Sequence, residues 1–91
     1  MGKRPRKTRT PGEYLRAVRE QATLSLRDVH IKSIPIASKY RNPAFLIPVS
    51  RLHDIEVKGV LPTIYRAYTL SQVYECDFSE ILALYGIPVS R

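Results

Sequence analysis

The sequence predicts an all-α domain of five short helices, and three observations carry that prediction. Apolar residues recur every three or four positions in five successive segments, which is the spacing of one helix face. Cap-forming residues precede four of these segments, and glycines follow two of them. No run of alternating residues is bounded by hairpin turns. With 91 residues and a hydrophobic content of 44%, the chain can build one small core.

The first two predicted helices have clear starts. The first covers about residues 11–22, after a Thr-Pro-Gly-Glu sequence with the form of a capping box. The second begins after Ser25, with Asp28 at the position that reaches back to cap it. Pro35 limits this helix, because proline lacks an N–H donor and crowds the preceding turn. The helix therefore either stops just before Pro35 or resumes, kinked, as far as Tyr40.

The third helix is predicted over about residues 48–58, with Gly59 as its C-terminal cap. The segment 34–47 before it forms an insertion between the second and third helices, and residues 42–48 have the composition of a loop. Its apolar side chains are too numerous for a free loop, so we expect the insertion to be ordered and to pack over those two helices.

The last two helices complete the bundle. Pro62 opens the fourth, and Asp77 with Glu80 has the form of a capping box at the start of the fifth, which ends at Gly86. Four tyrosines recur at helical spacing in this part: Tyr65, Tyr68, Tyr74 and Tyr85. They indicate core packing with hydroxyls at the edge, or alternatively an exposed aromatic patch for self-association.

The positive charge lies in the first two thirds of the chain. Residues 1–58 hold 13 Lys or Arg against 5 Asp or Glu, a balance of +8, whereas residues 59–91 have a balance of −1. A one-sided basic field usually faces a polyanion, most often nucleic acid. The start of the chain is predicted to be a disordered basic arm over residues 1–9, whose cations are Lys3, Arg4, Arg6, Lys7 and Arg9. The alternative is a solvated tail that only aids solubility.

Several short sequences occur in a characteristic order. They are Glu-Tyr-Leu-Arg at 13–16, Thr-Leu-Ser-Leu-Arg-Asp-Val at 23–29, Arg-Leu-His-Asp-Ile-Glu at 51–56, and the ungapped stretch 61–82. Together they resemble the lambda-repressor/Cro-type helix-turn-helix DNA-binding family. The resemblance covers about residues 11–86, and it implies a domain over 10–86 followed by a tail or linker over 87–91.

The chain departs from that family's pattern at the motif itself. The segment 34–47 is longer by a dozen or so residues than the tight turn that usually joins the two motif helices. Leu26 stands where the family usually has a polar residue that touches phosphate, and His30 where it has a small residue. Pro48 replaces the usual serine at the start of the recognition helix. The sequence therefore indicates a variant subfamily with an extended insertion.

The resemblance implies that the third helix reads the major groove of double-stranded DNA. The base-reading candidates are Val49, Ser50, Arg51 and His53. The candidates for contact with the DNA backbone are Ser25, Arg27, Lys39, Arg41 and Lys58. Val49 can equally pack under the insertion, and His53 can simply face solvent. Arg51 can either pair with guanine or form a surface ion pair with Asp54, which is expected to pair with Lys58 or Arg51.

Other classes of function find little support. A single cysteine and two histidines in separate helices do not make a zinc site, and no phosphate-binding or nucleophile motif occurs, so we expect no enzyme, cofactor or small-molecule ligand. Uncharged runs are too short to span a membrane. The expected protein is a cytoplasmic, nucleoid-associated transcriptional regulator that binds specific DNA sites, with a homodimer left open. The alternative is a protein-interaction or antitoxin-like module of the same fold.

Overall fold

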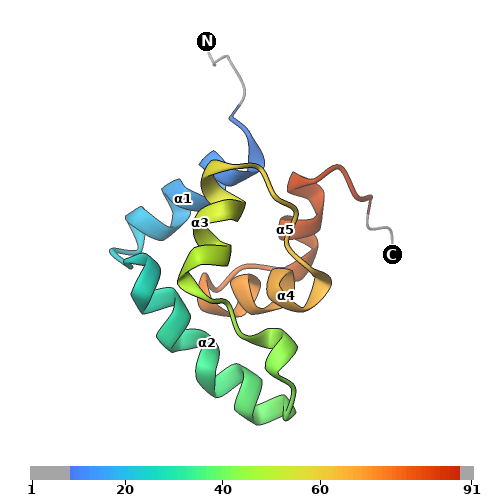
Figure 1. Cartoon of the computed structure of the whole chain (residues 1–91). Coiled ribbons are helices and arrows are strands. Elements are labelled where there is room, and N and C mark those ends of the chain that lie inside the picture. Colours follow the sequence, from blue (N-terminus) through green and yellow to red (C-terminus); the bar gives the residue numbers. More distant parts are fainter. Residues whose placement is uncertain (1–8, 89–91) are drawn as a thin grey trace.

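The computed structural model describes residues 9–88 and shows an all-α fold for them, as predicted (Figure 1). A short 3-10 helix, η1 (Pro43–Phe45), lies between the second and third α-helices. The α-helices are α1 (Pro11–Gln21), α2 (Leu26–Tyr40), α3 (Val49–Val57), α4 (Ile64–Val73) and α5 (Phe78–Leu84).

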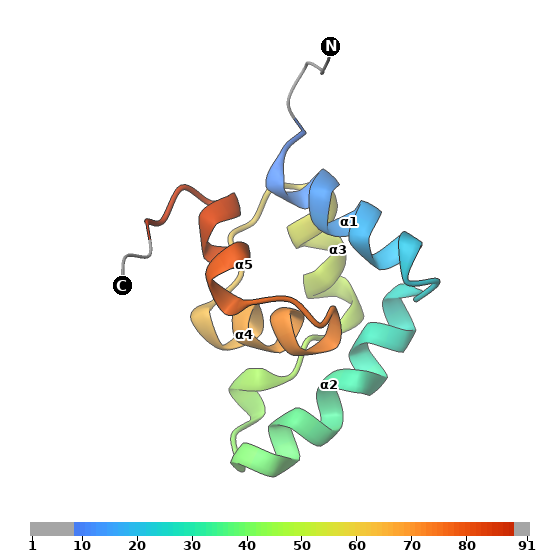
Figure 2. The same cartoon turned by 180° about the vertical axis from the view of Figure 1, so that it is seen from behind.

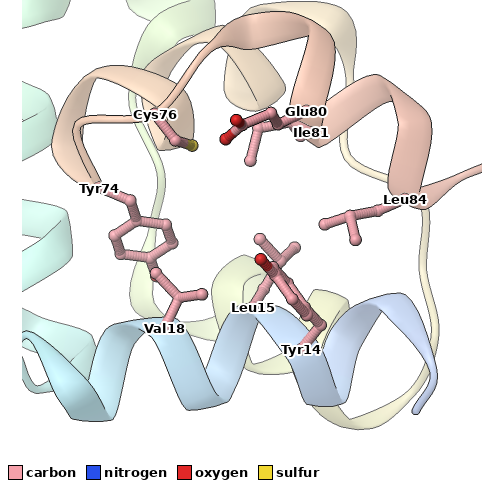
Figure 3. A pocket seen from close by; sticks show the side chains of 8 residues that line it. All are labelled: Tyr14, Leu15, Val18, Tyr74, Cys76, Glu80, Ile81 and Leu84. Carbon is pink, nitrogen blue, oxygen red and sulfur yellow. The ribbon is translucent and has the colours of Figure 1, made fainter. Parts of the chain in front are cut away.

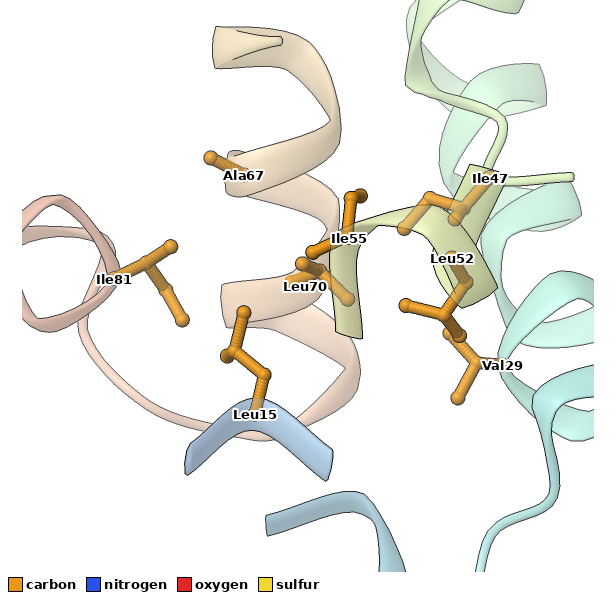
Figure 4. Close-up of a cluster of buried hydrophobic side chains, with 8 residues drawn as sticks. All are labelled: Leu15, Val29, Ile47, Leu52, Ile55, Ala67, Leu70 and Ile81. Carbon is orange, nitrogen blue, oxygen red and sulfur yellow. The ribbon is translucent and has the colours of Figure 1, made fainter. Parts of the chain in front are cut away.

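All five α-helices contribute to one hydrophobic core (Figure 4). Its eight buried members are Leu15, Val29, Ile47, Leu52, Ile55, Ala67, Leu70 and Ile81. Burying a large aliphatic side chain stabilises a fold by about 1.5–3 kcal/mol. The core therefore fixes α3 in place from behind, and α1 and α2 are the helices that pack directly on α3.

Helix α2 continues through Pro35 for 15 residues and ends at Tyr40, so the longer of the two predicted alternatives is the one found. Pro35 removes the helical donor for the carbonyl of Ile31. Both residues are exposed, so water can satisfy that carbonyl. Arg41 then ends the helix in a left-handed conformation with φ of 52°. Because residues 34–40 belong to α2, the connection to α3 consists of residues 41–48 only.

Two of the predicted capping boxes are confirmed. The N–H of Glu13 donates to the Thr10 hydroxyl at 3.1 Å, and the Glu13 carboxylate accepts from the Thr10 N–H at 3.0 Å. Ser25 and Asp28 make the same reciprocal pair at 3.0 and 2.8 Å. Each box satisfies donors that a helix start leaves without partners.

The starts of α4 and α5 differ from the prediction. Thr63 caps α4, which begins two residues after Pro62. The prediction of an Asp77–Glu80 capping box was wrong. Asp77 is the N-cap residue but makes no side-chain cap bond. The N–H of Glu80 instead donates to the backbone carbonyl of Asp77 at 2.9 Å, so the tight first turn uses the donor that the side chain would have taken.

Two contacts, one near each end of α1, join this helix to α3. At Gly12 a β-carbon would lie 2.5 Å from the carbonyl oxygens of Ile55 and Glu56, so only glycine permits this approach. Farther along, the Arg19 guanidinium donates two hydrogen bonds to the Glu56 carboxylate, at 2.8 and 2.9 Å. Both side chains are almost fully buried. A third bond, to the carbonyl of Leu24 at 2.9 Å, ties the turn before α2 to the same pair.

The connection between α2 and α3 is ordered, as expected, but it packs on α2 and α4 rather than on α2 and α3. The Phe45 ring lies 5.0 Å from the Tyr40 ring and 5.2 Å from the Tyr65 ring, centroid to centroid. The Thr69 hydroxyl donates to the Phe45 carbonyl at 2.7 Å. Ile34 does not join this packing, because its side chain is 47% exposed.

Candidate functional site

Helix α3 has one buried and one exposed face, which is the arrangement needed to present side chains to a partner. Leu52 and Ile55 are buried in the core. At about 100° per residue, Ser50 and Asp54 fall on the opposite side of the helix. In Figure 1 the helix lies in the foreground, and in Figure 2 it lies behind α1. On this outward face Ser50 is exposed, and the Asp54 side chain is 23% exposed.

The four base-reading candidates all lie on α3 and are exposed, with their exposure least at the start. Val49 is 38% exposed, so it is neither enclosed under the connection nor fully open. Ser50 is exposed. The side chains of Arg51 and His53 are 62% and 51% exposed. The structure thus brings the four candidates together on adjoining sides of one helix.

An acid lies among these residues. The Asp54 carboxylate is 3.8 Å from the Arg51 guanidinium and 3.7 Å from the His53 ring. The Lys58 ammonium approaches it at 3.7 Å, so the predicted pairing of Asp54 with Arg51 or Lys58 is found with both. Surface pairs of this kind contribute only about 0–1 kcal/mol, so the cations can exchange partners at small cost.

The start of α3 is anchored by side chains that the sequence analysis missed. The Ser33 hydroxyl accepts from the N–H of Ile47 at 3.1 Å and donates to the carbonyl of His30. The His30 Nδ1 donates to the Ile47 carbonyl at 3.0 Å. Because Ile47 is also fully buried, both of its backbone groups and its side chain fix where α3 begins. The sequence marked His30 only as a departure from the family pattern, and the burial of Ser33 becomes evident only in the folded chain.

Within residues 9–88, no side chain caps the first turn of α3. Pro48 is its N-cap residue and makes no side-chain cap bond. The first N–H groups of an α-helix have no partners within the helix, and together with the helix dipole they favour an anion. At the start of α2, in contrast, Ser25 and Asp28 already use such donors, and the hydrogen bond that the Asp28 carboxylate accepts from the Ser25 N–H holds the pKa of Asp28 below its usual value.

The backbone-contact candidates are spread along the molecule. Ser25 and Arg27 lie at the start of α2, whereas Lys39 and Arg41 lie at its end. At 1.5 Å per residue, Arg27 and Arg41 are separated by roughly 20 Å. Side chains so far apart cannot meet the same phosphate, so they would contact different stretches of backbone.

The predicted basic arm lies mostly outside the described residues. Its cations Lys3, Arg4, Arg6 and Lys7 belong to that undescribed part. Arg9 is described and is exposed. The chain enters α1 at Gly12, against the carbonyls at the end of α3, and both views show these two ends side by side (Figures 1 and 2). The N-terminal end of α1, which follows Arg9, therefore lies beside the C-terminal end of α3.

Exposed charge divides the chain into two kinds of segment. Residues 29–53 contain Lys32, Lys39, Arg41 and Arg51 and no Asp or Glu. Residues 67–88 contain three acids and no Lys or Arg. The α2–α3 part of the molecule is therefore positive, and the α4–α5 part is negative.

Comparison of the chain with protein-family models, with curated proteins and with solved structures finds no match. Within residues 9–88, no group of three or more His, Cys, Asp and Glu side chains is placed to hold a metal ion. No helix in the same residues is long and apolar enough to cross a membrane.

Proposed function

We propose that the chain is a sequence-specific double-stranded DNA-binding protein, a transcriptional regulator with a helix-turn-helix fold of the lambda-repressor type. The observation that carries the proposal is the outward face of α3, where Ser50, Arg51 and His53 are exposed while Leu52 and Ile55 anchor the helix from behind. A single α-helix fits the major groove and presents such side chains to base edges. The protein would act in the cytoplasm at the nucleoid, without catalysis or a cofactor.

Arg51 is the strongest candidate for reading a base. A guanidinium can donate two hydrogen bonds to guanine, and such a pair contributes about 1–3 kcal/mol of discrimination. Its present contact with Asp54 is long, at 3.8 Å, and lies at the surface. Exchanging that contact for a guanine edge therefore costs little.

Asp54 is the feature that opposes DNA binding, because a carboxylate repels phosphate. Three groups offset its charge: the Arg51 guanidinium, the Lys58 ammonium and the His53 ring when protonated. Asp54 can also contribute to specificity, because a carboxylate accepts a hydrogen bond from the amino group of cytosine. The proposal therefore assigns Asp54 a role in base selection rather than in affinity.

The remaining cations would set position rather than sequence. Arg27, Lys58 and the open N–H groups of the first turn of α3 surround the proposed recognition surface. Lys39 and Arg41 extend the positive surface toward the far end of α2. Contacts of this kind fix register on the duplex and depend strongly on salt.

The test is selection of bound sites from a random DNA pool, followed by measurement of affinity at the preferred site. Arg51→Ala should weaken binding there by about 1–3 kcal/mol and relax choice at one base pair, while binding to unrelated duplexes falls far less. Arg16→Ala is the matched control: it removes the same charge from an exposed ion pair on α1, 56% exposed. An unchanged preferred site and specificity ratio in the Arg51 variant would remove the base-reading role.

A second candidate, a protein-interaction module such as an antitoxin-like partner, is favoured by one observation. Large apolar side chains are exposed between the end of α3 and the start of α4: Val57, Val60, Leu61 and Ile64, at 47–67%. Patches of this kind often mark protein interfaces. If the DNA sites selected from the random pool contain two symmetric half-sites, a second copy of the chain binds beside the first. Failure to enrich any site, with no salt dependence, would favour the interaction module.

A further inference from the structure

A cavity of about 170 Å³ lies between α1 and α5, on the side of the molecule away from the outward face of α3 (Figure 3). Its apolar wall is formed by Leu15 and Val18 of α1 and by Ile81 and Leu84 of α5. An engineered apolar cavity of about 150 Å³ accommodates benzene. The space between α1 and α5 is therefore large enough for a group the size of one ring.

The polar groups around the cavity are acidic or neutral. Tyr14 and Glu80 come from α1 and α5, on opposite walls, and Tyr74 and Cys76 come from the turn between α4 and α5 (Figure 3). The Tyr74 hydroxyl is buried and has no hydrogen-bond partner in the part of the chain that the structure describes. Among residues 9–88, no Lys or Arg lines the cavity or pairs with the Glu80 carboxylate.

The electrostatic potential at this position is negative. Burial, with a further contribution from the carboxylates of Glu80 and Asp77, raises the pKa of the Cys76 thiol. The thiol is therefore neutral at physiological pH and adds no charge to the cavity. Tyrosine rings attract cations through their negative faces. An anion would be repelled here, whereas a cation gains from Glu80 and from the rings of Tyr14 and Tyr74.

We propose that this cavity binds a small organic cation: an ammonium group on an apolar body about the size of one ring. The body occupies the space between α1 and α5, and the ammonium lies at the mouth beside the Glu80 carboxylate. The ammonium has several N–H donors, and the carboxylate of Glu80 is the charged acceptor at the mouth. This site is separate from α3 and does not depend on the proposed DNA-binding function.

Three one-ring probes of similar size and different charge test the charge preference directly: benzylammonium, benzyl alcohol and benzoate. Each is titrated into the full-length ¹⁵N-labelled protein, and amide shifts are followed by NMR. We expect a saturable shift for benzylammonium with a Kd of about 1 mM, the affinity of a ligand this small. The shifts should centre on residues 14–18 and 76–84. Benzyl alcohol should bind about fivefold more weakly, and benzoate more weakly again.

Two substitutions and one control locate the site. Glu80→Gln should bring the affinity for benzylammonium down to that for benzyl alcohol, and Asp77→Asn, a nearby acid outside the cavity lining, should have the smaller effect. Val18→Phe should fill the cavity and abolish binding, provided that its melting curve remains cooperative. Equal affinities for the three probes on the wild-type protein, shifts centred elsewhere, or no saturation with benzylammonium would each overturn the proposal, whether or not the Val18 variant folds.

Discussion

Residues 29–53 and residues 67–88 supply the same core but opposite surfaces. The first segment contributes Val29, Ile47 and Leu52 to the core, and the second contributes Ala67, Leu70 and Ile81. On the outside, the first carries four cations and no acid, and the second carries three acids and no cation. Both segments bury aliphatic side chains of the same kind, whereas their surface charges have opposite signs. The core therefore explains the fold, and the surface charge explains which partners each side can accept.

The acids near the positive segment sharpen this contrast, because each has a partner. Asp54 is surrounded by Arg51, His53 and Lys58. Glu56 is buried against Arg19, and the hydrogen bonds it accepts raise the pKa of the arginine above its usual value. Neither carboxylate therefore presents an uncompensated negative charge to a polyanion. On the α5 side, Glu80 has no such partner among the described residues.

The largest expected effect is on stability, at the ion pair behind α3. Glu56→Ala should lower the free energy of unfolding by about 3–5 kcal/mol, because it leaves the Arg19 charge buried without its partner. Glu20→Ala, which breaks the exposed pair with Arg16, should cost less than about 1 kcal/mol. Urea denaturation of both variants gives the comparison. Similar losses in the two would mean that the buried pair does not hold α1 to α3.

The next largest effect is expected for DNA affinity when the arm is removed. Deleting residues 1–9 removes five cations. If all five contact phosphates, the slope of log affinity against log salt should flatten by about 4.5, and all duplexes should bind more weakly to a similar extent. Fluorescence anisotropy at several salt concentrations measures the slope. An unchanged slope would show that the arm does not touch DNA.

The smallest effect is expected on stability, at the N-terminal caps of α2 and α5. Asp28 has a lowered pKa because it accepts hydrogen bonds from the backbone and side chain of Ser25. Its contribution is therefore present above the ordinary carboxylate pKa and is lost as the pH falls through the lowered value. Asp28→Ala should destabilise the protein at pH 7 and have little effect in strong acid. Asp77→Ala, at the cap of α5 that makes no side-chain bond, should change stability less, and the opposite order in pH-dependent urea melts would contradict the cap assignment.

Local signals predicted much of the fold. Helical spacing and the Thr10 and Ser25 capping boxes located the first two helices, because these interactions lie within four residues of each other. Gly59 marked the end of α3 for a similar reason, since its φ of 74° favours glycine. At Asp77 the same type of pattern failed, because a backbone carbonyl took the donor that a side chain was expected to use.

Contacts between distant residues were not predictable in this way. Arg19 and Glu56 are 37 positions apart, and each resembles an ordinary charged helix residue in the sequence. The one local indication was that Arg19 follows Leu15 by four positions and so lies on the buried face. The bonds from Ser33 and His30 to Ile47 also depend on how α2 and the connection fold together. The candidate residues of α3 were placed on one helix correctly, and the pairing of Asp54 with Arg51 and Lys58 was foreseen, but the approach of His53 to the same carboxylate emerged only in three dimensions.

The most direct test of the contrast between the two surfaces is an NMR titration of the protein with a selected DNA duplex. The account predicts that amide shifts concentrate at residues 48–54 and at the start of α2, while the amides of α5 remain nearly unchanged. The same titration with Arg51→Ala should weaken binding without moving the perturbed region. Shifts centred on α5 or on residues 57–64, with α3 unaffected, would contradict the claim that the outward face of α3 meets DNA.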